Sequence, residues 1–543
     1  MRTINKIIAI DYETADAASK NNQGAAKAIE FSAIEISPDF QEIPGGRHHK
    51  IIGLNPSIVP NVEAYGITGI DPIASEKVAM TEFDFADFVS KLYLSQPNTA
   101  IMGYNSIAFD DEVTRHTLYR NLLSPYEHEF SKGNFRIDVY KAIQLAYAMA
   151  PNVINWPRKE DGTVSLKLED LTKANGISHE HAHSAESDVL ATIALAKMLS
   201  EANPKLWAHV LNCTDKNYTS DLMYQSDMFF HVERFYGKEN RYTKVMAVGA
   251  PNPEIPSQII CVDLNSPDFD EMLGLSPEQI RERRFRKLEN QDNGILGLQN
   301  IATNKMPMVV KATPNLLEHY KDQFNLDIER INRNLRTLQN TPEFKRVLQE
   351  SVVSERDVPK AYAHQLYFMP SFPSRETKKI LAEMHRKDRD GNPRIMTTSI
   401  AELASKTDDP ERYYDLALMA KWDNFYRYFL SPGNHSSIDK VEFVDWVDRL
   451  QDKLERGWDG TQTLDEFDKN FTRYMKESVL SEEKMIVLNN LKYVVDDKRK
   501  LLEGLRQTAE EMRPEAEAER ANRRDYKAFY ASVNRRGVPQ LGY

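Results

Sequence analysis

The stretch from Lys6 to Thr14 (KIIAIDYET) constrains the fold of this chain most strongly. Its central apolar run, rich in β-branched side chains, predicts a short buried strand. The strand ends in Asp11 and Glu13, which lie two positions apart and therefore face the same side of a sheet, roughly 6.6 Å from each other. Ligands bind at the carboxyl ends of strands in open α/β sheets, and paired carboxylates there are typical of hard divalent cations.

A solvated strand end is the simpler interpretation of the same two residues. The chain contains 81 Asp and Glu residues, so a D-x-E sequence arises by chance in several places. The pair therefore predicts a metal site only together with further acidic residues at the same edge of the sheet.

Length and composition predict a soluble globular protein. A chain of 543 residues with 41% hydrophobic and 28% charged residues is long enough for about three or four domains. No apolar run approaches the ~18 residues of a membrane-spanning helix, and the N-terminus lacks the pattern of a signal peptide. The two cysteines, Cys213 and Cys261, favour a reducing, cytoplasmic compartment without disulfides.

The net charge of −11 argues mildly against general nucleic-acid binding. It does not exclude it, because metal-binding carboxylates add negative charge and an acidic protein can carry a local basic groove.

The pattern of the chain changes three times. Residues 1–203 predict one α/β domain, with strands at 30–36, 49–54 and 99–104 and helices at 82–94, 111–122, 138–149, 167–174 and 185–202. Residues 204–355 contain short extended segments between Pro, Gly and Asn turns and predict a smaller β-rich domain. Residues 356–506 are helix-rich, and 507–543 form an additional charged tail, for which we expect an exposed helix followed by a flexible end.

Three further residues of the first domain can reach the end of the first strand. Asp110 follows the predicted strand at 99–104, and Asp188 lies one turn into the helix that Ser184 can cap. His183 precedes Asp188 by five residues. Four carboxylates and one His suit two-metal phosphoryl chemistry, in which ions ~3.5–4 Å apart clamp the attacking and leaving oxygens. A neutral His with a pKa of about 6.5 is a suitable base for the attacking water.

Each of these residues also has an ordinary structural interpretation. Asp188 can interact with the helix dipole, and Asp110 can cap the following helix. The segment from His179 to His183 also matches the H-E-x-x-H pattern of zinc proteases, which requires both His residues on one helix. Because Asn175-Gly176 ends a helix and Ser184 can begin the next, we expect these residues to lie on a loop instead.

The order of the acidic motifs is similar to that of a known superfamily. D-x-E, then N-x-x-x-F-D, then H-x-x-x-x-D resembles the DEDDh (DnaQ-like) 3′–5′ exonuclease superfamily. Longer strings resemble the exonuclease I family of single-strand-specific exodeoxyribonucleases: GYNSIAFDDEVTRHTLYRN (103–121), INWP (154–157) and LEDLTKANGISHEHAHSAESDVLATIALAKML (168–199). The resemblance is strong over residues 1 to about 200 and weaker from there to about 505, and the tail matches nothing in the family.

This resemblance implies a ribonuclease-H-like exonuclease domain, then an SH3-like β-barrel domain, then a helical domain, which together clamp single-stranded DNA. It implies a monomeric enzyme of DNA repair or recombination that releases mononucleotides from a 3′ end with two Mg²⁺ ions, for which Mn²⁺ can substitute. The implied metal ligands are Asp11, Glu13, Asp110 and Asp188, with His183 as the general base. The implied DNA-binding residues are Thr14, Arg115, Tyr126, Phe130 and Lys167.

The chain departs from the family at one surface. Its bacterial members resemble one another in a basic pocket that binds the acidic tail of single-strand DNA-binding protein. The positions that align with this pocket hold Ala150, His209, Asn315 and Gln339, which puts that partner in doubt. Two alternatives for the whole chain stay open: an exonuclease of RNA or short oligonucleotides, and a non-catalytic nucleic-acid scaffold.

Overall fold

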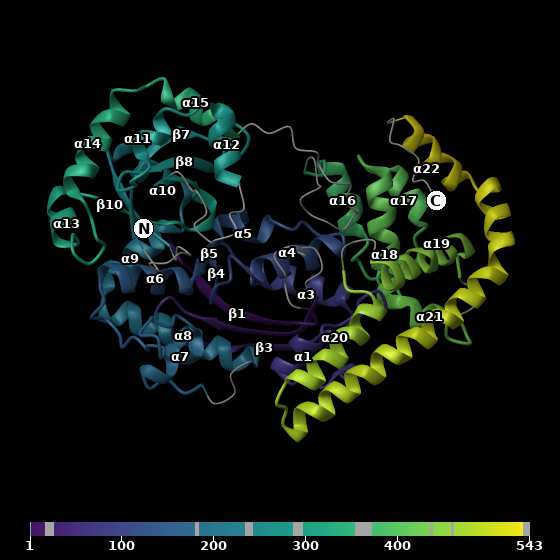
Figure 1. The fold of residues 1–543 in the computed structure, drawn as a ribbon. Coiled ribbons are helices and arrows are strands. Elements are labelled where there is room, and N and C mark those ends of the chain that lie inside the picture. Colours follow the sequence, from purple (N-terminus) through teal and green to yellow (C-terminus); the bar gives the residue numbers. More distant parts are fainter. Residues whose placement is uncertain are drawn as a thin grey trace.

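The computed structural model of this chain describes residues 2–16, 27–179, 184–233, 243–285, 297–352, 372–434, 438–457 and 461–535. Three regions follow one another along the chain (Figure 1). The first is a mixed sheet with flanking helices, the second is a smaller antiparallel sheet, and the third is helical. This order confirms the α/β class and the sequence of regions expected above.

The first region is built on a five-stranded sheet with the order β3-β2-β1-β4-β5. The central strand pairs antiparallel with β2 and parallel with β4, which in turn pairs parallel with β5. The strand predicted from KIIAIDYET is therefore confirmed at the middle of the sheet. The strands are β1 (Lys6–Thr14), β2 (Ala28–Ile36), β3 (Glu42–Ile51), β4 (Thr99–Gly103) and β5 (Phe135–Asp138).

Helices cover both faces of this sheet, and alternate residues of β1 face different helices. Ile7 and Ala9 belong to a core that includes α6 and α8, whereas Ile8, Ile10 and Tyr12 belong to a core with α3 and α4. The helices of this region are α1 (Val62–Thr68), α2 (Pro72–Glu76), α3 (Glu82–Tyr93), α4 (Asp110–Arg120), α5 (Glu127–Phe130), η1 (Ser131–Gly133), α6 (Val139–Met149), α7 (Leu168–Ala174), α8 (Ala185–Ala202) and α9 (Pro204–Cys213). The next helix, α10 (Lys216–Gln225), packs on the second sheet, where Met223 shares a core cluster with Phe229 and Met246.

The second region contains another five-stranded sheet, with the order β10-β6-β7-β8-β9 and antiparallel pairing throughout. Its strands are β6 (Phe229–Val232), β7 (Thr243–Pro251), β8 (Gln258–Asp263), β9 (Leu298–Ala302) and β10 (Met308–Lys311). Its helices are α11 (Phe269–Leu273), α12 (Pro277–Phe285), η2 (Thr303–Lys305), α13 (Pro314–His319), α14 (Ile328–Gln339) and α15 (Phe344–Val352).

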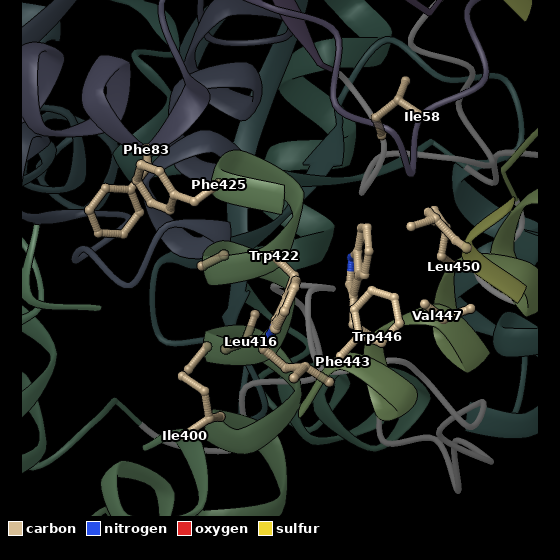
Figure 2. Packing of buried hydrophobic residues seen from close by; sticks show 14 of the residues in the cluster. Ile58, Phe83, Ile400, Leu416, Trp422, Phe425, Phe443, Trp446, Val447 and Leu450 are labelled. Atoms are coloured by element: carbon tan, nitrogen blue, oxygen red, sulfur yellow. The ribbon is translucent and has the colours of Figure 1, made fainter. Parts of the chain in front are cut away.

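The third region is helical and shares its core with the first region (Figure 2). Trp422 and Trp446 stack with ring centroids 5.5 Å apart, and Phe425 meets Phe83 of the first region edge-on at 5.6 Å. The helices are α16 (Arg375–Glu383), η4 (Arg394–Thr397), α17 (Ile400–Ser405), α18 (Pro410–Phe429), α19 (Lys440–Gln451), η6 (Asp452–Arg456), α20 (Leu464–Glu477), α21 (Glu482–Asn522) and α22 (Arg524–Arg535).

The described part of the charged tail is helical, as expected, but one side of it is packed against the third region. Position 506, where we placed the end of the helical domain, lies inside α21, which continues to Asn522 along the outer edge of the third region (Figure 1). Arg513 donates two hydrogen bonds to Asp448, at 2.8 and 3.0 Å. Tyr526 and Phe529 of α22 are buried, and the Phe529 ring stacks on that of Tyr414. The described tail residues are therefore packed, because apolar side chains interrupt their charged sequence.

Two strands were not predicted. β5 has only four residues, and the sequence pattern assigned its last residue, Asp138, to the following helix. In the structure Asp138 ends β5 and caps α6 by accepting a hydrogen bond from the backbone N–H of Tyr140. β9 lacks a clear alternation of apolar and polar residues, and its place in the sheet depends on pairing with β8.

Two expectations about the environment of the chain concern the described residues only. Every helix in this part of the chain is too short or too polar to span a membrane. Cys213 and Cys261 are both buried and unbonded to each other, so the expected absence of a disulfide between them is confirmed.

Candidate active site

Asp11 and Glu13 extend the face of β1 that α8 covers. Ile7 and Ala9 pack against that helix, and the two-residue repeat of a strand places Asp11 and Glu13 on the same side. On the neighbouring strand β2, Asp11 lies opposite Ser32 and Glu13 lies opposite Glu30. The predicted pair of adjacent carboxylates is therefore present at the carboxyl end of a buried strand.

Asp188 completes a compact acidic group. It lies in the first turn of α8, and one ligand oxygen from each of Asp11, Glu13 and Asp188 lies within 4.8 Å of the other two. Ser184 occupies the N-cap position, as expected, but its side chain makes no capping hydrogen bond. The helix start therefore presents Asp188 toward the end of β1.

Asp110 is a separate, more deeply buried member of the site. It is the first residue of α4 and is only 2% exposed. Among neighbouring charges its carboxylate contributes most to the raised pKa of Asp11, although it does not belong to the group of oxygens within 4.8 Å. Its Oδ1 atom is buried and has no hydrogen-bond partner among the described residues. A buried acceptor without a donor is costly, and a bound cation would satisfy it.

The electrostatics of these carboxylates are those of like charges in a buried place. Burial, followed by the charges of Asp188 and Glu30, raises the pKa of Glu13 to about 8. Burial and neighbouring carboxylates also raise the pKa values of Asp11 and Asp110. Without a counter-charge these groups hold protons that a cation would displace. Sequence reasoning missed Glu30, because its place opposite Glu13 follows from the register of β2 on β1.

His179 also reaches this site. Its Nε2 atom forms a hydrogen bond with Oδ1 of Asp188, and its Nδ1 atom lies 3.1 Å from Oγ1 of Thr172 on α7. His179 lies between α7 and α8 outside any helix, so the described part of this segment does not have the helical geometry of the zinc-protease motif. His183, the predicted general base, lies outside the described residues.

The donor set fits hard divalent cations. Asp11, Glu13 and Asp188 offer carboxylate oxygens within reach of one ion, and the unpartnered Oδ1 of Asp110 adds another. Mg²⁺ and Mn²⁺ prefer such oxygen ligands, whereas zinc prefers sites with more nitrogen or sulfur. These four carboxylates are thus the residues that could hold metal.

Two of the residues expected to contact DNA, Arg115 and Tyr126, lie together. Arg115 is 8% exposed, pairs with Glu112 at 2.5 Å and Glu129 at 2.6 Å, and lies 5.3 Å from the centre of the Tyr126 ring. Its guanidinium thus supports Tyr126 from within the protein. Phe130, four residues further on, is 63% exposed.

The same surface includes Phe372, an aromatic residue that sequence reasoning missed. It is 67% exposed, and its ring lies edge-on to that of Tyr126 at 5.8 Å. No motif singled it out, because it is distant in sequence and reaches this place only through the fold.

The other two expected DNA-binding residues lie elsewhere. Thr14 is buried and donates a hydrogen bond from Oγ1 to the backbone oxygen of Asp16 at 2.8 Å. Lys167 is exposed at the start of α7, with its Nζ atom 3.0 Å from Glu169.

The positions aligned with the basic pocket carry little positive charge. Burial lowers the pKa of His209, and its Nε2 atom lies 2.8 Å from the backbone oxygen of Val309. Gln339 contacts Asp227 at 3.5 Å, Ala150 follows α6, and Asn315 lies on α13.

The comparisons with known proteins agree with this geometry. Residues 8–196 match the profile of the family described as Exonuclease, and residues 215–352 match the Exonuclease I SH3-like domain. The fold and the carboxylate site thus define a metal-binding nuclease of the exonuclease class.

Relatives that align with most of the chain identify the family within this class. Exodeoxyribonuclease I of Haemophilus influenzae is 28% identical over 478 residues, which cover 87% of this chain and 94% of the relative. Exodeoxyribonuclease I of Escherichia coli K12 is 32% identical over 340 residues, 62% of this chain and 70% of the relative. This chain belongs to the exonuclease I family.

Solved structures show the same likeness. The crystal structure of E. coli exonuclease I in complex with a dA16 oligonucleotide aligns with a TM-score of 0.77 and 26% identity, covering 91% of this chain and 100% of that chain. The moderately thermophilic exonuclease I of Methylocaldum szegediense aligns with a TM-score of 0.78 and 27% identity, covering 91% and 99%.

Proposed function

We propose that this protein is a metal-dependent 3′–5′ exodeoxyribonuclease that degrades single-stranded DNA to mononucleotides, in DNA repair or recombination. The observation that carries the proposal is the group of carboxylates of Asp11, Glu13 and Asp188 at the end of β1, within which the pKa values of Asp11 and Glu13 are raised by burial and by neighbouring carboxylates. Family membership supports it, because the relatives are named exodeoxyribonuclease I and related crystal structures contain single-stranded oligonucleotides.

Asp11, Glu13, Asp110 and Asp188 would hold up to two Mg²⁺ ions, with Mn²⁺ as a substitute. When bound, such ions neutralise the phosphodiester, lower the pKa of a water and stabilise the leaving oxygen. The carboxylates hold their charges close together for this purpose. His183 would take the proton of the attacking water, a role that the resemblance implies and that typically contributes 10²–10⁴-fold in rate.

The exposed aromatic residues offer a route for the strand. The rings of Tyr126 and Phe372 lie edge-on to each other, Arg115 is held against the first of them, and Phe130 is exposed four residues further along the chain from Tyr126. Base stacking on aromatic rings is tolerant of sequence and contributes about 1–3 kcal/mol per base, which suits a nuclease without sequence preference. Thr14 and Lys167 would contact the strand closer to the scissile bond.

The decisive experiment uses a 5′-labelled single-stranded DNA, its duplex form and the matching RNA. Each is incubated with Mg²⁺, with EDTA, and with the Asp11→Ala variant. We expect shortening of the single-stranded DNA from its 3′ end, only with Mg²⁺ and only with Asp11 present. Failure of the wild-type protein to shorten this DNA with Mg²⁺ would overturn the proposal.

The two alternatives predict different patterns in the same experiment. An exonuclease of RNA or short oligonucleotides would prefer the RNA, and a scaffold would bind the DNA without cleaving it. The long second and third regions disfavour the first alternative, since trimming short ends needs no clamp. The complete set of four carboxylates disfavours the second.

We propose further that the acidic tail of single-strand DNA-binding protein is not held at the family's pocket. The aligned side chains supply no strong cation, since burial lowers the pKa of His209 and the other three positions are neutral. A pull-down with the acidic tail peptide should recover little protein. Tight binding that depends on His209 or Gln339 would show that the pocket works with other residues.

A further inference from the structure

We infer that His179 is a positioning residue of the metal site, holding the Asp188 carboxylate in the orientation in which it binds the cation. The inference rests on the proposed function, since it assigns His179 a role in that same site. It gives a function to a side chain that lies outside the D-x-E, N-x-x-x-F-D and H-x-x-x-x-D motifs.

The His179 ring is bonded at both edges. Nε2 forms a hydrogen bond with Oδ1 of Asp188, and Nδ1 lies 3.1 Å from Oγ1 of Thr172. Because a carboxylate oxygen accepts, the Nε2–H group donates. The side chain of His179 is only 6% exposed, so water competes little for these bonds. Two bonds on opposite edges fix the plane of the ring and the direction from which it approaches Asp188.

The anchor on the far side of the ring is itself rigid. Thr172 is fully buried in α7, and the single proton of its hydroxyl is donated either to Nδ1 of His179 or to the backbone oxygens of Leu168 and Glu169, which lie 2.9 and 3.0 Å away. Beyond the helix, the N–H of Ile177 donates to the backbone oxygen of Thr172 at 2.9 Å. The side-chain oxygen of Asn175 accepts from the N–H of Asn155 at 2.8 Å. The segment that leads to His179 is therefore fastened to α7 and to a neighbouring loop.

This arrangement addresses a specific weakness of the acidic group. Asp188 lies in the first turn of α8, where its side chain can rotate, and Glu13 repels it. A carboxylate has two oxygens, so a hydrogen bond to Oδ1 leaves the other oxygen for a cation. Residues that hydrogen-bond to metal ligands typically change metal affinity or activity by 10–100-fold when they are replaced.

A competing role for His179 predicts the opposite change in metal affinity. If His179 instead competed with the cation for Asp188, its removal would free the carboxylate and tighten metal binding. The direction of the change in metal affinity therefore decides between the two roles.

The test measures Mn²⁺ binding to the full-length protein without DNA, by electron paramagnetic resonance of the free ion. We expect His179→Ala to weaken Mn²⁺ binding by about 10–100-fold. We expect His179→Gln to recover much of it, because the Gln amide can place an N–H near the position of Nε2. In the cleavage assay, the Mg²⁺ concentration for half-maximal rate should rise by the same factor, with kcat at saturating Mg²⁺ changed only a few-fold.

Matched variants separate positioning from loss of structure. Thr172→Val removes the anchor of the ring, and we expect binding about fivefold weaker, the effect of one hydrogen bond. Thr219→Val is its control, because Thr219 is equally buried and forms the same kind of bonds to its own helix, to Asp215 and Lys216, without a His partner. The control should bind Mn²⁺ like the wild-type protein. If His179→Ala fails to fold, the comparison of Thr172→Val with Thr219→Val still tests the positioning role.

The outcomes distinguish this inference from the proposed function. A wild-type protein that neither binds Mn²⁺ nor cleaves DNA would refute both. A wild-type protein that binds and cleaves, with His179→Ala and Thr172→Val unchanged or tighter in Mn²⁺ binding, would overturn the positioning role alone.

Discussion

Two clusters of buried charge lie in the first region, and they are built in opposite ways. The site carboxylates are Asp11, Glu13, Asp110 and Asp188. The paired cluster consists of Lys27, Glu82 and Arg120, in which Glu82 lies 3.1 Å from the Lys27 ammonium and 2.7 Å from the Arg120 guanidinium. Asp110 and the paired cluster's Glu82 are buried and the other site carboxylates are half-buried, but only the second cluster contains its own counter-charges.

The pKa values record this difference. Burial acts to raise the pKa of Glu82, but the charges of Arg120 and Lys27 outweigh it and lower the pKa to about 2. Burial raises the pKa of Glu13 to about 8, and its charged neighbours Asp188 and Glu30 act in the same direction. Buried carboxylates that the protein neutralises itself serve the structure, whereas carboxylates that it holds together without a counter-charge favour a cation from outside.

The surroundings of the paired cluster agree with a structural role. Glu82 begins α3, and the next residue, Phe83, enters the core shared by the first and third regions (Figure 2). The Phe83 ring stacks on His385 of the third region at 4.0 Å. The paired cluster therefore lies beside the contact between two regions.

The largest effect that would break this comparison comes from Asp11→Asn, which removes one charge from the site carboxylates. Turnover should fall by at least about 10³-fold, because the metal site supplies several kcal/mol of transition-state stabilisation. Without metal the variant should be as stable as the wild-type protein or more stable, since the change removes repulsion. Single-turnover cleavage measures the loss of turnover, and urea unfolding in EDTA measures the change in stability. A large loss of stability would mean that Asp11 has a structural partner.

The same carboxylate-to-amide change in the paired cluster should have the opposite result. Glu82→Gln leaves Lys27 and Arg120 without their buried partner, and we expect about 3–5 kcal/mol lower stability. Cleavage by the folded fraction should stay within a few-fold of wild type. The control is Glu76→Gln, which breaks a surface pair with Arg427 and should cost under about 1 kcal/mol. Equal effects of the two variants in urea unfolding would contradict the distinction.

The two clusters should affect the pH dependence of stability over different pH ranges. The folded state raises the pKa of Glu13 from 4.5 to about 8, so between these values the native protein binds more protons than the unfolded one. The unfolding free energy without metal should therefore fall as pH rises from 4.5 to 8, by a few kcal/mol at about 1.4 kcal/mol per pKa unit. The lowered pKa of Glu82 acts in the other direction, and its stabilisation is lost as pH falls from 4.5 to about 2.

Melting temperatures in EDTA and in Mg²⁺ across pH 4.5 to 8 test the first window. Added Mg²⁺ should flatten the fall, and Glu13→Gln should reduce it in EDTA. If the melting temperature of the wild-type protein in EDTA stayed constant or rose with pH, the site carboxylates would not bind the extra protons that their raised pKa values imply.

The sequence revealed one of these clusters and not the other, for a physical reason. Asp11, Glu13, Asp110 and Asp188 occur at ends of predicted strands and helices, where periodicity alone says which way a side chain points. Lys27, Glu82 and Arg120 come from three distant segments, and Glu82 lies where a helix N-terminus alone accounts for a carboxylate. Their pairing depends on how the sheet and helices pack, which no local pattern contains.

The same limit explains the other residues that were missed. Glu30 belongs to the site through the register of β2 on β1, and Phe372 through the approach of the third region to Tyr126. The tail was misjudged because its charges suggested an exposed helix. In the structure many of those charges are partnered, and the few apolar residues between them, such as Tyr526, are buried.

The tail supplies the smallest effect and the last comparison, since its ion pairs are partly exposed. Arg513 and Asp448 have side chains 32% and 39% exposed, so water screens their attraction. A double-mutant cycle of Arg513→Ala and Asp448→Ala in urea unfolding should give a coupling of about 0.2–1 kcal/mol. A cycle of Lys27→Met and Glu82→Gln should give several times more, because the Lys27 and Glu82 side chains are 0% and 2% exposed and water screens their attraction little. If the two coupling energies were equal, burial would not strengthen the pairing in the paired cluster. The paired cluster would then differ from the site carboxylates only in containing charges of opposite sign.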